Sequence, residues 1–147
     1  MEYVIKSIEE VKDIPFEVGR DIKITLESNY LNYHFRVIPK NYDEKLLVFS
    51  NGAVDVAKKQ PPVFMRHSWQ DEFKSSLVYL DDPTIHGLGL KLGWGQGRIE
   101  EFALEVYSTI IIELAKSLQI NDDNVFYYGS SAGGFMSLVL SAMHKKS

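Results

Sequence analysis

Apolar and polar residues alternate in two neighbouring segments of the first third of the chain. Within residues 22–27 and again within 33–37, every second residue is large and apolar. This period of two predicts β-strands with one buried face, and the polar stretch 28–32 between them predicts an antiparallel hairpin. His34 falls on the polar side, so we interpret it as a solvated strand residue. The first twelve residues leave two interpretations open, a helix or an edge strand over residues 3–5.

Later segments carry the longer-range pattern of an α/β fold. Unbroken apolar runs at 46–49 and 77–80 predict strands that are covered on both faces. A helical segment at about 66–73 and an amphipathic helix from 98 to about 119 lead on to a third strand at 125–128. This order predicts one α/β domain over the whole chain, with a mostly parallel sheet, an N-terminal antiparallel hairpin and helices on both faces.

A Gly-x-Ser-x-Gly motif directly follows the strand predicted at 125–128. Its members are Gly129, Ser131 and Gly133, and a helix is predicted to begin immediately afterwards. Strand, motif and helix in this order are typical of a nucleophile elbow, a sharp turn that holds a serine upright. We therefore predict a positive φ at Ser131, with the two glycines relieving the crowding around it. Phosphate-binding turns and tight packing also use such small residues, so the motif alone leaves these alternatives open.

Composition narrows the classes of partner. The net charge is −4 and there is no basic cluster, which gives little electrostatic support to binding of nucleic acid or of an anionic membrane. The chain has no cysteine, which excludes disulfides and thiol catalysis. No run is apolar for long enough to span a bilayer and the N-terminus lacks a signal-type apolar core, so we expect a cytoplasmic protein. We predict no cofactor and no metal, and we interpret the paired Asp81 and Asp82 as a turn.

The segment 87–97 is rich in glycine but lacks the spacing of a dinucleotide-binding fingerprint. We interpret it as a mobile loop at the same edge of the sheet as the elbow. Trp94 within this loop is a candidate for the wall of a substrate pocket, with ordinary packing as the alternative. His86, at the start of the loop, is a candidate base that could reach Ser131.

From the hairpin to the helix after the elbow, the sequence resembles the α/β-hydrolase family. The hairpin, the turn after the next strand and the elbow motif carry this resemblance. It implies that Ser131 is the nucleophile and that the amide of Ala132 is one donor of an oxyanion hole. It also implies a second donor in the turn, at Ala53 or Gly52, where this sequence has Asn51 in place of the histidine of many members.

Two shorter stretches carry a second resemblance. Residues 128–134 and the Trp-Gln-Asp-Glu-Phe run at 69–73 resemble bacterial surface-polysaccharide biosynthesis proteins and the hydrolase-like accessory proteins of adhesin secretion. This resemblance implies a glycan as substrate or partner.

The sequence departs from the hydrolase pattern after the serine. In that family the acid and the histidine of the triad follow the nucleophile. His144 is the only histidine after Ser131, and a helix of thirteen residues would carry it about 20 Å away. We therefore expect the chain to be the N-terminal part of a longer fold, incomplete at its C-terminus, with the acid and the base outside it. The strand 125–128 would then be uncovered, which favours self-association.

Two functions fit these observations. The first is a serine esterase or acyltransferase that forms an acyl-enzyme on Ser131 and passes the acyl group to water or to a sugar hydroxyl. Its substrate would be a small-molecule ester or a glycan, and the isolated chain is expected to be inactive. The alternative is a non-catalytic hydrolase-like module that binds a protein or a glycan partner.

Overall fold

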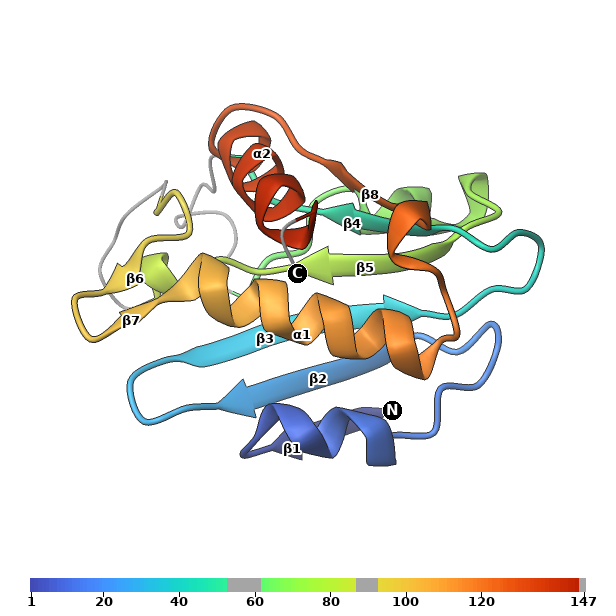
Figure 1. Ribbon diagram of the computed structural model, residues 1–147, viewed down its shortest axis with the longest axis horizontal. Coiled ribbons are helices and arrows are strands. Elements are labelled where there is room, and N and C mark those ends of the chain that lie inside the picture. The colour runs from blue at the N-terminus through green and yellow to red at the C-terminus, as the bar shows by residue number, and fades with distance from the viewer. Residues whose placement is uncertain (53–61, 87–92, 146–147) are drawn as a thin grey trace.

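A six-stranded mixed sheet forms the centre of the protein. The computed structural model describes residues 1–52, 62–86 and 93–145. The strands of the sheet are β1 (Glu2–Ile5), β2 (Ile22–Glu27), β3 (Asn32–Ile38), β4 (Leu46–Phe49), β5 (Ser76–Leu80) and β8 (Val125–Tyr128). Their order across the sheet is β1-β2-β3-β5-β4-β8 (Figure 1). The element β8, which leads into the elbow, therefore lies at one edge of the sheet.

Strand pairing confirms the predicted α/β class and its hairpin. β2 and β3 pair antiparallel, with Ile24 opposite Phe35 and Leu26 opposite Tyr33. β4 pairs in parallel with both β5 and β8, as the buried apolar runs predicted. At the other edge β1 pairs in parallel with β2, and the 3-10 helix η1 (Ile8–Asp13) follows it. Both interpretations of the N-terminal segment are thus realised, one after the other.

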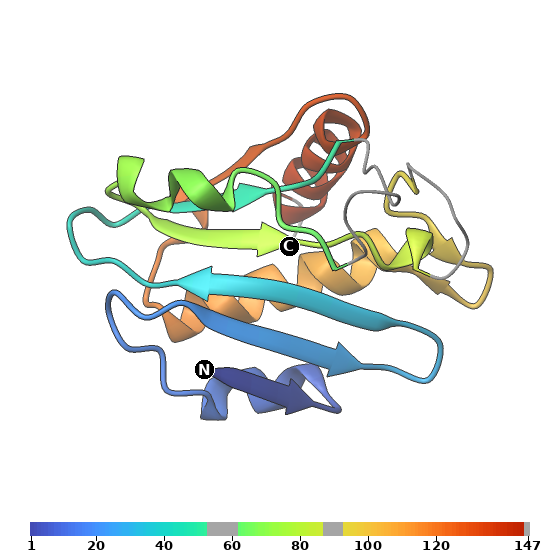
Figure 2. The same ribbon diagram turned by 180° about the vertical axis from the view of Figure 1, so that it is seen from behind.

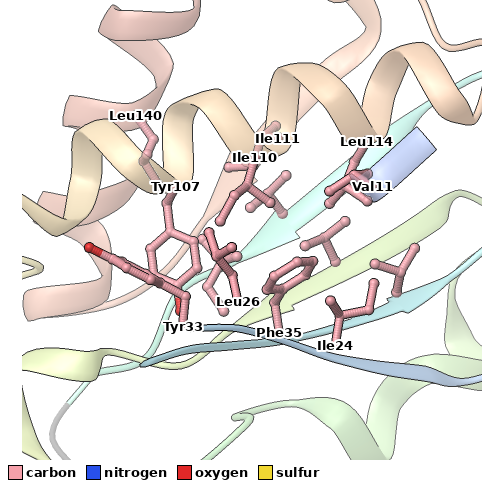
Figure 3. Close-up of a cluster of buried hydrophobic side chains, with 14 of the residues drawn as sticks. Val11, Ile24, Leu26, Tyr33, Phe35, Tyr107, Ile110, Ile111, Leu114 and Leu140 are labelled. Atoms are coloured by element: carbon pink, nitrogen blue, oxygen red, sulfur yellow. The ribbon is translucent and has the colours of Figure 1, made fainter. Parts of the chain in front are cut away.

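The two α-helices cover one face of the sheet. Helices α1 (Ala103–Ser117) and α2 (Ala132–Lys145) lie on this face together with η1 (Figure 1). Apolar side chains of α1 pack against the inward positions of β2 and β3 and form the main core (Figure 3). The other face carries the 3-10 helix η2 (His67–Glu72) near β4 and β5 (Figure 2). Helical structure is therefore present on both faces, but within the described residues only one face has α-helices.

The long helix begins later than the sequence pattern predicted. It starts at Ala103 and not near residue 98, because the preceding residues form a small antiparallel hairpin of β6 (Gly97–Arg98) and β7 (Glu101–Phe102). Gly97 has a φ of 74°, and a Cβ atom there would lie 2.4 Å from the carbonyl oxygen of Glu101. Ile99 at the tip of this hairpin is fully exposed. Its helical spacing relative to α1 was therefore coincidental.

The strand β8 is open on its outer side in the described structure. Among the described strands it pairs only with β4, and the side chains of Phe126 and Tyr128 are 46% and 52% exposed. An open groove of about 660 Å³ runs between β8 and α2. The predicted uncovered edge is therefore present, and self-association through it stays a prediction. No helix in the described parts of the chain has the length and apolarity that a membrane span requires.

Candidate active site

Ser131 lies in a sharp turn between β8 and α2. Its φ is 56°, in the left-handed region that side chains other than glycine rarely adopt. Ser131 is exposed, while Ala132, the first residue of α2, is buried. The predicted positive φ at Ser131 is therefore confirmed.

The two motif glycines are required by backbone crowding. A Cβ atom at Gly129 would lie 2.3 Å from the carbonyl oxygen of Gly133. A Cβ atom at Gly133 would lie 2.5 Å from the carbonyl oxygen of Ser50, which follows β4. Atoms do not approach so closely without a shift of the backbone. The glycines therefore allow the start of α2 to pack directly on both neighbouring strand ends.

The turn after β4 contacts the elbow, as the hydrolase resemblance implied. The amide of Ser50 donates to the carbonyl of Tyr128 at 3.0 Å and extends the ladder between β4 and β8. A Cβ atom at Gly52 would lie only 3.0 Å from the carbonyl oxygen of Ser130. The buried Asn51 side chain fixes the turn, because its amide donates to the carbonyl of Val63 at 2.6 Å.

The two expected oxyanion donors within the described residues differ in whether the amide already has a hydrogen-bond acceptor. Ala132 opens α2, where backbone N–H groups have no partner within the helix and the helix dipole is positive. The amide of Gly52 instead donates to the Sδ atom of Met65 at 3.2 Å. A thioether is a weak acceptor, so an oxyanion would be the stronger partner for this amide. Ala53 lies outside the described residues.

His86 belongs to a separate cluster at the end of β5. Its Nε2 atom lies 2.5 Å from Oδ2 of Asp81, which is fully buried. The hydrogen bond with Asp81 raises the pKa of His86 above its usual value. The ring of His86 stacks on His34, with centroids 5.3 Å apart. The sequence predicts a solvated His34, but in the structure His34 is half-buried and bonded to Thr25 Oγ1 at 2.9 Å.

The structure does not bring His86 to the serine. β4 separates β5 from β8, which places their ends about 10 Å apart at ordinary strand spacing. No contact among the described residues joins His86 to Ser131. His144 is also distant, since it lies near the far end of α2 and bonds through Nδ1 to the Tyr127 hydroxyl at 2.9 Å.

Trp94 stands beside the helix that follows the elbow. Its ring packs edge-on against Phe135 of α2, with centroids 5.7 Å apart, and it is 42% exposed. The neighbouring Gly95 amide donates to Oδ2 of Asp82 at 3.0 Å, and the mobility of the glycine-rich segment stays a prediction. Residues 87–92 lie outside the described part of the chain. Asp82 also accepts from the amide of Thr84 at 3.0 Å, which confirms the turn interpretation for Asp82 but not for Asp81, whose carboxylate bonds to His86 and to the amide of Val63.

Sequence reasoning missed one residue at the elbow, Arg66. Its Nη2 atom donates to Oγ of Ser130 at 3.1 Å, and its guanidinium lies over the ring of Tyr128 at 4.8 Å from the centroid. Sixty-four residues separate Arg66 from Ser130. A contact of this kind leaves no local pattern, so only the folded chain reveals it.

The structure is an α/β fold in which a serine with a left-handed backbone lies in the turn between β8 and α2. No protein-family model matches the chain, and no curated protein matches it. Among solved structures it is similar to the capsule O-acetyltransferase of Neisseria meningitidis serogroup A, with a TM-score of 0.55 and 16% sequence identity. The match covers 79% of this chain and 44% of that protein, so this chain spans less than half of its length. At this identity the similarity supports the fold alone, and membership of the α/β-hydrolase family stays a prediction.

Proposed function

We propose that Ser131 is the nucleophile of an acyltransferase or esterase, and that the acyl acceptor is a hydroxyl of a bacterial surface polysaccharide or water. The observation that carries this proposal is the left-handed backbone of an exposed serine at the start of a helix. Strain of this kind costs about 1–3 kcal/mol and is concentrated at functional sites. The solved structure with a similar fold is named a capsule O-acetyltransferase, which supports a glycan acceptor.

The reaction would proceed in two halves. In the first, Oγ of Ser131 attacks the carbonyl carbon of an acyl donor, its proton passes to a general base, and the donor's leaving group departs with a proton. In the second, a hydroxyl oxygen of the acceptor attacks the acyl carbon, its proton passes to the general base, and the bond to Oγ breaks as Oγ takes a proton back from that base. The Ala132 amide would stabilise the negative charge on the carbonyl oxygen in both halves. The Gly52 amide would join it once the Met65 thioether moves away.

The general base is a separate part of the proposal. A serine hydroxyl needs a positioned base to become an effective nucleophile near neutral pH. The described histidines are engaged elsewhere, including His86 with Asp81 and His144 with Tyr127. We therefore propose that the base and its acid come from polypeptide outside these 147 residues.

A second candidate function is a non-catalytic module that binds a protein or a glycan. One observation favours it: the Gly52 amide, a candidate oxyanion donor, is engaged by the Met65 sulfur. In such a module the elbow would be retained for its packing, because Gly129 and Gly133 let α2 approach the strand ends.

Covalent labelling of the full-length protein with a fluorophosphonate probe separates these candidates. Acyl transfer through Ser131 predicts labelling that Ser131→Ala abolishes. Ser130→Ala is the matched control, because Ser130 is the adjacent exposed serine and should not be the site of labelling. Full-length protein that is folded but does not label would support the binding module. Labelling that survives Ser131→Ala would overturn the assignment of the nucleophile.

A further inference from the structure

Arg66 occupies an unusual position beside the elbow. Its φ is 64°, so it is one of the few non-glycine residues in the left-handed region. The side chain crosses to the end of β8, where it donates to Ser130 and covers the ring of Tyr128. A second aromatic ring, that of Trp69, also lies against this guanidinium, with its centroid 5.8 Å from the guanidinium carbon. Two aromatic rings and one hydroxyl thus fix a cation next to Ser131.

The guanidinium of Arg66 has unused hydrogen-bonding capacity. Its Nη1 atom is buried and has no hydrogen-bond partner in the described structure. Leaving a buried donor of a charged group without a partner is destabilising, because the group has lost its hydration and gained nothing in exchange. Unpaired groups of this kind are uncommon and call for a functional explanation. The neutral Oγ of Ser130 satisfies only one of the N–H groups on Nη2.

Two of the other three arginines, unlike Arg66, form ion pairs with carboxylates. Arg36 forms a two-bond ion pair with Asp21, and Arg20 bonds to Glu17 at 3.2 Å. Arg66 forms no ion pair with any described aspartate or glutamate. A guanidinium that is partly desolvated, flanked by aromatic rings and free of a carboxylate is suited to accept an anion from outside.

We propose that Arg66 binds an anionic group of the substrate, a carboxylate or a phosphate, and so positions that substrate beside Ser131. This inference rests on the proposed function, because it specifies a chemical group on the acyl acceptor or acyl donor that reacts at Ser131. The planar guanidinium can form two parallel hydrogen bonds with either anion, and the buried Nη1 atom would gain a partner only after the side chain shifts to expose it. Glycans or acyl donors that carry such a group near the reacting atom would then be preferred over neutral ones.

Anion binding can be measured without catalysis, in full-length protein that carries Ser131→Ala. We expect inorganic phosphate or acetate to bind this protein, as followed by calorimetry or NMR titration. Arg66→Gln should weaken binding about tenfold or more, because hydrogen bonds to a charged group contribute about 1.5–3 kcal/mol. Arg66→Lys should restore it only in part, because an ammonium lacks the planar fork. Whichever of the two anions binds more tightly identifies the chemical source of the group.

Arg98→Gln provides the matched control, because Arg98 is an exposed arginine on the β6–β7 hairpin. It should leave anion binding unchanged. If Arg66→Gln does not fold, Arg66→Asn replaces it, since asparagine tolerates the left-handed backbone. Anion binding that is absent, or equal in the Arg66 and Arg98 variants, overturns the proposal. These outcomes are independent of fluorophosphonate labelling, so a failure of the proposed function is recognised separately.

Discussion

The imidazole of His86 is bonded to the buried carboxylate of Asp81 and stacked on the imidazole of His34, with ring centroids 5.3 Å apart. The hydrogen bond to Asp81 raises the pKa of His86, whereas burial lowers the pKa of His34. Two adjacent histidines are thus held with opposite preferences for the proton. The structure therefore stacks two imidazoles whose pKa values are shifted in opposite directions.

This arrangement predicts opposite pH dependences for the two rings. The contribution of His86 to stability is fully present below its ordinary pKa of 6.5 and is lost as the pH rises through its raised folded value. For His34 stability is lost as the pH falls from 6.5 through its lowered folded value. NMR titration of the ring resonances should show His86 titrating above His34. Asp81→Asn should lower the pKa of His86, and an unchanged titration would contradict the assignment.

Substitution of the adjacent glycines Gly133 and Gly134 should have opposite effects on stability. Gly133→Ala should lower the free energy of unfolding by about 2–3 kcal/mol, because the new methyl group meets the Ser50 carbonyl. Gly134→Ala is the control within the same helix, where a Cβ atom would lie 3.4 Å from its nearest neighbour. It should raise stability by about 0.5–1 kcal/mol through helix propensity. Urea denaturation measures both, and equal effects would argue against the crowded elbow.

Stability and activity should change in opposite directions at Ser131. Ser131→Gly relieves the left-handed strain and should raise the free energy of unfolding by about 1 kcal/mol, since the left-handed region costs other residues that much. Ser131→Ala keeps the Cβ atom and should give no such gain. Both variants should lose fluorophosphonate labelling in the full-length protein. A glycine variant that is less stable than the alanine variant would show that Ser131 is not strained.

The open edge should make the chain associate with itself. Phe126 is 46% exposed on β8, where unpaired backbone groups accompany it. Sedimentation velocity should show larger species as the concentration of the 147-residue chain rises. Phe126→Lys should reduce this association, while Ile99→Lys, at a fully exposed position on the distant hairpin, should not. A chain that stays monomeric at every concentration would show that the β8 edge does not mediate self-association.

The 147-residue chain alone should not hydrolyse an activated ester at a rate that depends on Ser131. Binding and oxyanion donors without a base leave a residual acceleration of about 10³–10⁴ over water, so slow turnover is expected in any case. The measurement compares wild type with Ser131→Ala and His86→Ala. Fast turnover that both substitutions abolish would make His86 the base and remove the need for residues outside the chain.

Local patterns predicted the parts of the structure that local stereochemistry dictates. The hairpin followed from alternation in β2 and β3, and the sharp turn at Ser131 followed from glycines spaced two residues either side of it. The start of α1 was predicted wrongly because the apolar spacing runs through the β6–β7 hairpin, where Gly97 bends the chain. The pair Asp81 and His86 was missed although the residues are five apart, because an aspartate after a strand also suits an ordinary turn. Contacts that join distant segments have no such local signal.

The backbone crowding at Gly129 and at Gly133 has a consequence for how this protein can evolve. Each glycine excludes a side chain on account of the other's backbone or of the strand beside it, so neither position can be exchanged alone. Relief would require β4, β8 and α2 to separate together, which no single substitution achieves. We therefore expect these two sites to be the slowest to drift while the surface around them diverges freely. Even in homologues that have changed their substrate, their partners and most of their sequence, we expect these two glycines to be retained.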